Sequence, residues 1–147
     1  MVAGVTSALA APLLAQIPCT HRGAADQILI CTGTGRAGAQ LVAPDWNPAR
    51  TTIFLMSLHR IDQVVEILIN AGWDPEVPCA SIERASSPDQ RIVRTKLRHI
   101  SEALQAVGSR PPGLLVVGRV CEVIAHPNSK WVVEDGAQTT DENDEYM

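Results

Sequence analysis

Apolar residues recur at the spacing of an amphipathic helix in two stretches of the chain. The first covers residues 61–69, where the apolar side chains share one helical face, and Gly72 follows as a suitable end for that helix. The second covers residues 97–107 and is closed in the same way by Gly108. The pattern therefore predicts two helices that each bury one face against a neighbouring layer.

Shorter and almost continuous apolar runs lie around these helices. They predict strands at residues 27–31, 51–56, 77–83 and 114–123. A further helix is predicted from Thr6, which suits an N-cap, to about Gln16, with Pro12 kinking it. Because strands alternate with helices, we expect an α/β fold with a largely buried sheet.

The length and composition fit one compact domain with a hydrophobic core. The chain has 147 residues, of which 46% are hydrophobic and 19% charged. Six of its 16 acidic residues and none of its 12 basic ones lie in residues 134–147, so the remainder carries a formal charge of +2. We therefore expect a domain over residues 1–124 and an acidic, disordered tail over residues 125–147.

Several classes of partner are disfavoured by these features. The body is weakly positive and the whole chain has only five aromatic residues, which suits an anionic small molecule better than nucleic acid. The four cysteines form no Cys-x-x-Cys pair, so no metal site is expected, and their use fits a reducing compartment. The N-terminus lacks the basic start of a secretory signal, and no apolar run approaches the roughly 20 residues of a membrane span. We expect a cytoplasmic protein with no membrane partner.

One glycine motif invites a different interpretation. Residues 33–38 match the dinucleotide pattern G-x-G-x-x-G and follow a predicted strand. That motif requires a helix that opens at its last glycine, because the helix N-terminus holds the pyrophosphate. Here Pro44 and Pro48 follow within a few residues, which leaves no room for the helix. The segment is therefore predicted to be a loop, and nicotinamide-dinucleotide binding is rejected.

Five blocks of the chain, in the same order, resemble the C-terminal half of the uroporphyrinogen-III C-methyltransferases, which belong to the tetrapyrrole methylases. The blocks are Ala-Gly-Val-Thr-Ser-Ala at residues 3–8, Ile-Pro-Cys-Thr-His-Arg at 17–22, Thr-Ile-Phe-Leu-Met-Ser at 52–57, residues 78–86 and residues 109–118. The last two blocks are most similar to the fungal branch. The resemblance implies a mixed sheet of about five strands flanked by helices.

The resemblance also implies sites on this chain. In the family the residues that match Thr6, Ser7, Met56 and Ala85 lie at the S-adenosylmethionine cofactor. The chain departs from the family at Ala3, where proline is usual, and at Ser57 and Ala85, where glycine is usual. His21 and Arg22 match a block near the tetrapyrrole, whose carboxylates arginine can bind through two hydrogen bonds.

Each of these residues also has a plain structural interpretation. A helix cap and first turn would by themselves explain Thr6 and Ser7. Met56, taken alone, is more typical of a core residue. His21 and Arg22 can be a buried polar pair or a loop contact. A basic stretch formed by Arg84, Arg91, Arg94 and Arg98 is more typical of a solvated face.

The reaction implied by the resemblance is the transfer of methyl groups from S-adenosylmethionine to uroporphyrinogen III, which yields precorrin-2 for sirohaem. The resemblance covers only the C-terminal half of the family. We therefore expect no catalytic residue in this chain and little activity from the chain alone. The implied reaction requires no metal, and we expect none. The family also implies a homodimer. Two alternatives remain: a non-catalytic, dimerising module, or a methylase of another corrinoid precursor. The block Thr20-His21-Arg22 favours the sirohaem branch.

Overall fold

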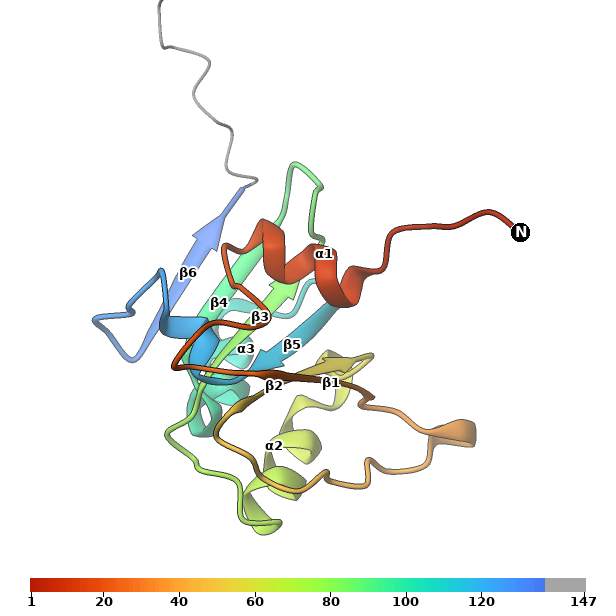
Figure 1. The fold of residues 1–147 in the computed structure, drawn as a ribbon, viewed down its shortest axis with the longest axis vertical. Helices are drawn as coiled ribbons and strands as arrows, with labels where there is room; N and C mark the ends of the chain where they lie inside the picture. The colour runs from red at the N-terminus through yellow and green to blue at the C-terminus, as the bar shows by residue number, and fades with distance from the viewer. Residues whose placement is uncertain (137–147) are drawn as a thin grey trace, which may run out of the picture.

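A computed structural model describes residues 1–136, which form one mixed sheet with helices on both faces (Figure 1). The helices in this part of the chain are Ser7–Leu14 (α1), Ile61–Asn70 (α2) and Ile100–Val107 (α3). The strands are Gln27–Thr32 (β1), Arg50–Leu55 (β2), Pro78–Glu83 (β3), Arg91–Lys96 (β4), Gly113–Val117 (β5) and Trp131–Asp135 (β6). Short 3-10 turns lie at Arg36–Gly38, Leu58–Arg60, Leu97–His99 and Arg119–Glu122.

The strands are ordered β1-β2-β5-β3-β4-β6 across the sheet. β1 and β2 run parallel, and each of the other neighbouring pairs runs antiparallel. The predicted α/β fold with a mixed sheet is confirmed, and the described residues contain six strands rather than about five.

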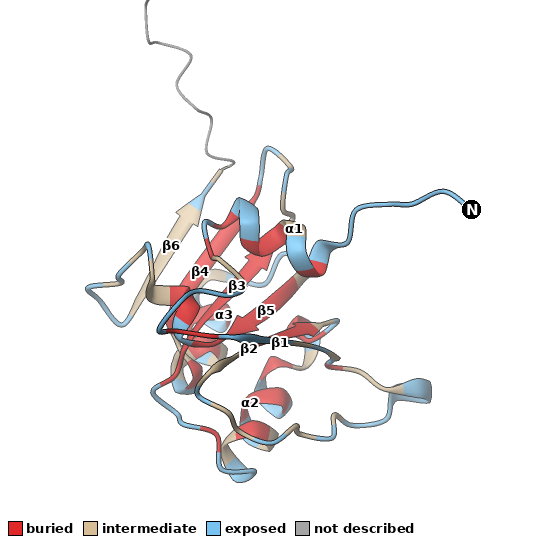
Figure 2. Ribbon diagram, in the orientation of Figure 1, coloured by how far each residue is buried: buried red, intermediate tan, exposed pale blue. Residues whose placement is uncertain are grey.

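The sheet separates two apolar cores. Successive side chains of a strand point to opposite faces, so in β5 Leu115 and Val117 join the core under α2 and α3. Leu114 and Val116 of the same strand join the core under α1. The three central strands β5, β3 and β4 are accordingly buried along most of their length (Figure 2).

β4 is a strand that the apolar pattern does not reveal, because three of its six residues are basic. The sequence predicts a solvated face there, and this is wrong for Arg91 and Arg94, whose exposed fractions are 2% and 3%. Each has an acidic partner: Glu83 contacts Arg91, and Glu134 contacts Arg94. These partners come from neighbouring strands, so only the sheet brings the charges together.

The sheet also continues past the expected domain boundary at residue 124. β6 pairs antiparallel with β4, with Val133 opposite Val93. Trp131 and Val133 pack against the core under α2 and α3, while Glu134 pairs with Arg94. The expectation of an acidic, disordered tail over residues 125–147 therefore does not hold for β6, and residues 137–147 lie outside the described residues.

The last predicted strand, 114–123, is shorter than expected. β5 ends at Val117, and after Gly118 the chain turns into the 3-10 segment Arg119–Glu122. α1 likewise ends at Leu14 rather than near Gln16 and contains Pro12. No helix among the described residues is long and apolar enough to cross a membrane.

Candidate functional site

A pocket of about 520 Å³ lies where β2 and β3 end and β5 begins, beside the start of α1. It is lined by Ser7, Ala11, Leu55, Met56, Ile82, Arg84, Ala85, Ser87, Pro112, Gly113 and Leu114. The structure thus brings three of the four residues with an implied cofactor role, Ser7, Met56 and Ala85, to one pocket. The fourth, Thr6, lies next to it and caps α1, where its Oγ1 accepts a hydrogen bond from the Ala8 amide at 3.3 Å.

The backbone around this pocket has three left-handed residues that are not glycine. Met56 and Arg84 have φ of 50°, and Ser86 has φ of 66°. Such conformations are costly for residues with a side chain and are enriched at functional sites. Met56 is 60% exposed, so it is not part of the core.

Ser57, for which the resemblance implies a departure from glycine, is not among the residues that line this pocket. The Ser57 side chain is buried, and its Oγ donates a hydrogen bond to the Phe54 carbonyl at 3.0 Å. It packs against the end of β1 instead, where a Cβ on Gly33 would lie 2.7 Å from the Ser57 Cα. Gly33 therefore has a packing role, and the segment after Gly38 contains no helix, as predicted for a loop.

A smaller hollow of about 400 Å³ adjoins the first and shares Met56, Pro112 and Gly113 with it. Its polar residues include Thr34 and His59. The Thr34 hydroxyl donates to the Met56 carbonyl at 3.0 Å and lies 3.2 Å from His59 Nε2. The sequence patterns gave neither residue a role: Thr34 is a variable position of the rejected glycine motif, and His59 lies in the turn after β2.

An ion pair borders the larger pocket. The Arg84 Nε lies 2.6 Å from an Asp89 carboxylate oxygen, and the hydrogen bond from Arg84 lowers the pKa of Asp89 below its ordinary value. Arg84 also donates its backbone N–H to the Pro112 carbonyl at 2.8 Å. The end of β3 is thereby tied to the segment that leads into β5.

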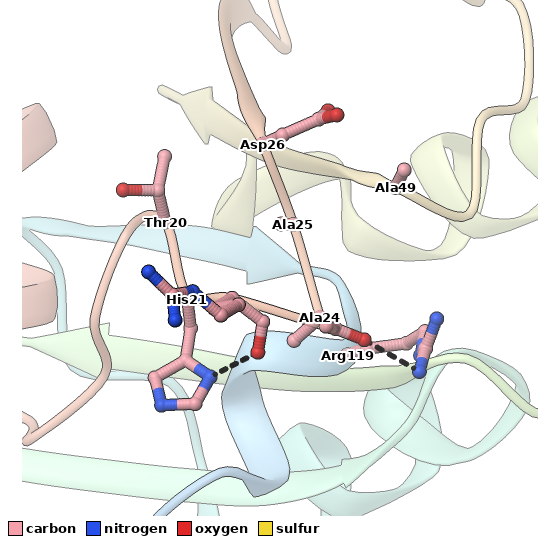
Figure 3. Close-up of a pocket in the computed structure, with 9 residues that line it drawn as sticks. Thr20, His21, Ala24, Ala25, Asp26, Ala49 and Arg119 are labelled. Carbon is pink, nitrogen blue, oxygen red and sulfur yellow. Dashed lines mark hydrogen bonds between the residues drawn. The ribbon is translucent and has the colours of Figure 1, made fainter.

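His21 and Arg22 lie in a different hollow, of about 610 Å³, which Arg119 also lines (Figure 3). His21 Nδ1 donates to the Arg22 carbonyl at 2.9 Å, and Arg119 Nη2 donates to the Gly23 carbonyl at 2.9 Å. His21, Arg22 and Arg119 are exposed, so the structure favours the loop-contact interpretation of the first two over a buried pair. Asp26 is the acidic residue of this hollow.

The hollow lined by His21 and the pocket lined by Ser7 and Ala85 lie at opposite ends of the same strands. Ala49, just before β2, lines the hollow of His21, whereas Met56, just after β2, lines the pocket of Ser7 and Ala85. At about 3.3 Å per residue the separation along β2 is on the order of 20 Å. The structure therefore does not bring the implied substrate residues next to the implied cofactor residues.

The cysteines behave as core or loop residues. Burial raises the pKa of the Cys79 thiol well above its ordinary value and that of Cys121 to about 12. Among the described residues, no three His, Cys, Asp or Glu side chains are grouped as a metal site would require.

An α/β sheet with a pocket at the ends of its strands is an architecture that many small-molecule-binding domains share. The chain belongs to the Tetrapyrrole (Corrin/Porphyrin) Methylases, whose family model matches residues 1–101. It is 46% identical over 140 residues to the uroporphyrinogen-III C-methyltransferase of Saccharomyces cerevisiae, covering 90% of this chain and 24% of the relative. It is 45% identical over 124 residues to a probable enzyme of that name from Schizosaccharomyces pombe, covering 84% of this chain and 25% of the relative.

A solved structure extends the comparison to the fold. The uroporphyrin-III C-methyl transferase from Thermus thermophilus, complexed with S-adenyl homocysteine, matches with a TM-score of 0.70 and 34% identity. The match covers 88% of this chain and 54% of that chain. The chain thus spans about a quarter of the fungal relatives and about half of the Thermus protein.

Proposed function

We propose that this chain forms the C-terminal part of an S-adenosylmethionine-dependent enzyme that C-methylates uroporphyrinogen III to precorrin-2 for sirohaem synthesis. The observation that carries the proposal is the convergence of Ser7, Met56 and Ala85, distant in sequence, on one pocket. The bound S-adenyl homocysteine of the Thermus relative supports the choice of ligand.

The residues of the pocket fit this cofactor. Its volume of about 520 Å³ is within the range of small-molecule sites. Leu55, Ile82 and Leu114 make part of the lining apolar, which suits an adenine ring, and Ser7 adds a residue with a hydroxyl to that lining. When bound, the cofactor would supply the methyl group, while Met56 and Ala85 would contact it and exclude water.

The carboxylates of the substrate would be bound at the hollow lined by His21, Arg22 and Arg119. Arg22 and Arg119 present guanidinium groups there, which bind carboxylates through paired hydrogen bonds. Because this hollow lies about a strand length from the pocket, we propose that Arg22 holds the periphery of the macrocycle rather than its reacting carbon. We assign no catalytic residue among the residues of this chain.

A test of the cofactor proposal is titration calorimetry of the chain with S-adenosylhomocysteine. We expect saturable binding, which Ala85→Leu should weaken by about tenfold or more because the larger side chain fills the pocket. The matched control is Ala106→Leu, a substitution on the exposed side of α3 that should leave binding unchanged. Absence of binding, or equal affinity in Ala85→Leu, would contradict the proposal.

A second assay addresses turnover. Under this proposal the chain supplies only part of the enzyme, so we expect little methylation of uroporphyrinogen III by these 147 residues alone. Robust transfer of a labelled methyl group would overturn that expectation. The mass of the product would also separate uroporphyrinogen methylation from methylation of another corrinoid precursor.

A non-catalytic, dimerising module is a second candidate, favoured by exposed apolar side chains. Leu9 and Leu13 on α1 and Ile28 and Ile30 on the edge strand β1 are 40% to 74% exposed. Such residues can be covered by another copy of the chain. Light scattering that shows a dimer, together with no binding of S-adenosylhomocysteine, would favour this candidate.

A further inference from the structure

Two oppositely charged residues are buried side by side where the neighbouring strands β3 and β4 meet at one end of the sheet. Glu83 at the end of β3 is opposite Arg91 at the start of β4. Their exposed fractions are 0% and 2%, and Arg91 Nε and Nη2 lie 2.7 and 2.6 Å from the same carboxylate oxygen of Glu83. An ion pair so buried is costly unless its remaining hydrogen-bonding groups are satisfied.

The remaining groups of this pair bind the connection between α3 and β5. Arg91 Nη1 donates to the Val107 carbonyl at 3.1 Å, and Arg91 Nη2 donates to the Gly108 carbonyl. On the other side, Glu83 Oε1 accepts from the Arg110 backbone N–H at 2.6 Å. It also lies 3.3 Å from the Ser109 hydroxyl, which donates to it.

The same connection leads directly into the wall of the candidate cofactor pocket. Pro112 and Gly113 line both the larger pocket and the adjoining hollow, and Ser109 lines the hollow. The fit at Gly113 is tight, because a Cβ there would lie 2.8 Å from the Ile82 carbonyl oxygen and 3.1 Å from Glu83 Cγ. A shift of the connection would therefore change the shape of the pocket.

We propose that Glu83 and Arg91 are positioning residues that hold segment 109–113 as the wall of the cofactor pocket. This inference rests on the proposed function for the identity of the ligand. A buried ion pair gives little net stability over apolar residues of similar volume, so stability alone does not account for it. The pair instead fixes the position of the connection between α3 and β5, because its charged groups make several hydrogen bonds of defined geometry to that connection.

The test separates positioning from stability. The variant Glu83→Met/Arg91→Met removes both charges together, so the chain should still fold. Its affinity for S-adenosylhomocysteine should nevertheless fall by about tenfold or more, because the wall is no longer held. The matched control is Lys96→Met/Glu122→Met, which removes a half-buried ion pair at the other end of β4 and should bind within about twofold of the unmodified chain.

A second measurement needs no ligand. Hydrogen exchange at the Arg110 amide should be faster by about tenfold or more in the first variant and unchanged in the control. If the double variant Glu83→Met/Arg91→Met does not fold, Glu83→Gln/Arg91→Gln, which also withdraws both charges but keeps polar side chains, is measured in the same way.

The outcomes distinguish the two proposals. If the unmodified chain binds S-adenosylhomocysteine and Glu83→Met/Arg91→Met binds it equally well, the positioning role is overturned. If the unmodified chain does not bind it, the proposed function fails, and exchange at Arg110 then decides the positioning role alone. Unchanged exchange at Arg110 would reject that role.

Discussion

At the residue scale, Gly33 matches a dinucleotide-binding motif but has a packing role. It begins a G-x-G-x-x-G pattern, yet glycine is required at this position because the chain after β2 passes close to it. A Cβ at this position would lie 2.7 Å from both Cα and Cβ of Ser57. No side chain fits there without moving the backbone.

We therefore expect Gly33→Ala to destabilise the fold by about 1–3 kcal/mol, the usual cost of overpacking. Gly33→Ala/Ser57→Gly should recover only part of this, because the Ser57 Cα remains. Gly4→Ala, where a Cβ meets no atom within 4 Å, is the control and should change stability by less than about 0.5 kcal/mol. Urea unfolding measures all three, and an unchanged midpoint for Gly33→Ala would show that the contact is absent.

At the scale of the element, α1 depends on a capping residue that sequence alone suggested. Thr6 has an extended backbone, with φ of −90° and ψ of 132°, and its Oγ1 accepts from the Ala8 amide. The helix places Ala8 and Ala11 in the core and Ser7 at the pocket. The cap thus orients the element that carries one side of the candidate site.

Thr6→Ala should lower the free energy of unfolding by about 1 kcal/mol, because α1 loses its N-cap. Thr6→Ser retains the hydroxyl and should restore most of the stability. Ser7→Ala serves as the neighbouring control, because Ser7 lines the pocket but does not cap the helix, and its effect should fall on S-adenosylhomocysteine binding instead. Thermal unfolding and calorimetry separate the two effects, and equal stability of Thr6→Ala and the unmodified chain would refute the capping role.

β4 and β6 show why part of the sheet could not be predicted. The sequence of β4 presents arginines where a buried strand usually has apolar residues, and β6 lies in a stretch rich in acids. Burying either strand alone would leave an unpaired charge, because the buried Arg94 and the half-buried Glu134 are each compensated by the other. They are 40 residues apart, so local patterns carry no sign of the pairing.

At the scale of the whole molecule, the resemblance named more of the residues that line the larger pocket than periodicity did. Hydrophobic spacing predicted α2 and α3 and the positions of four strands, because each element buries one face or a continuous run. It could not show that the ends of β2 and β3 meet beside α1, since Ser7 and Ala85 are joined only by tertiary packing. It also could not show that Arg22 lies at the other end of the sheet from Met56.

The two cores on either side of the sheet each contain a buried thiol, Cys79 in one and Cys121 in the other. Burial raises the pKa of both, that of Cys121 from its ordinary value of 9.0 to about 12. Above pH 9 the unfolded chain therefore loses protons that the folded chain keeps, so rising pH favours unfolding. The stabilisation is complete below pH 9 and is lost between pH 9 and about 12.

We expect Cys121 alone to lower the free energy of unfolding by about 2 kcal/mol at pH 10.5 relative to pH 8, with a further loss from Cys79. Urea unfolding in the presence of a reductant, followed across this range, measures the loss. Cys79→Ala/Cys121→Ala should show a shallower decline, because the remaining thiols of Cys19 and Cys31 are only partly buried. A decline equally steep in that variant would assign the alkaline loss to other groups and leave the two cores without a titrating residue.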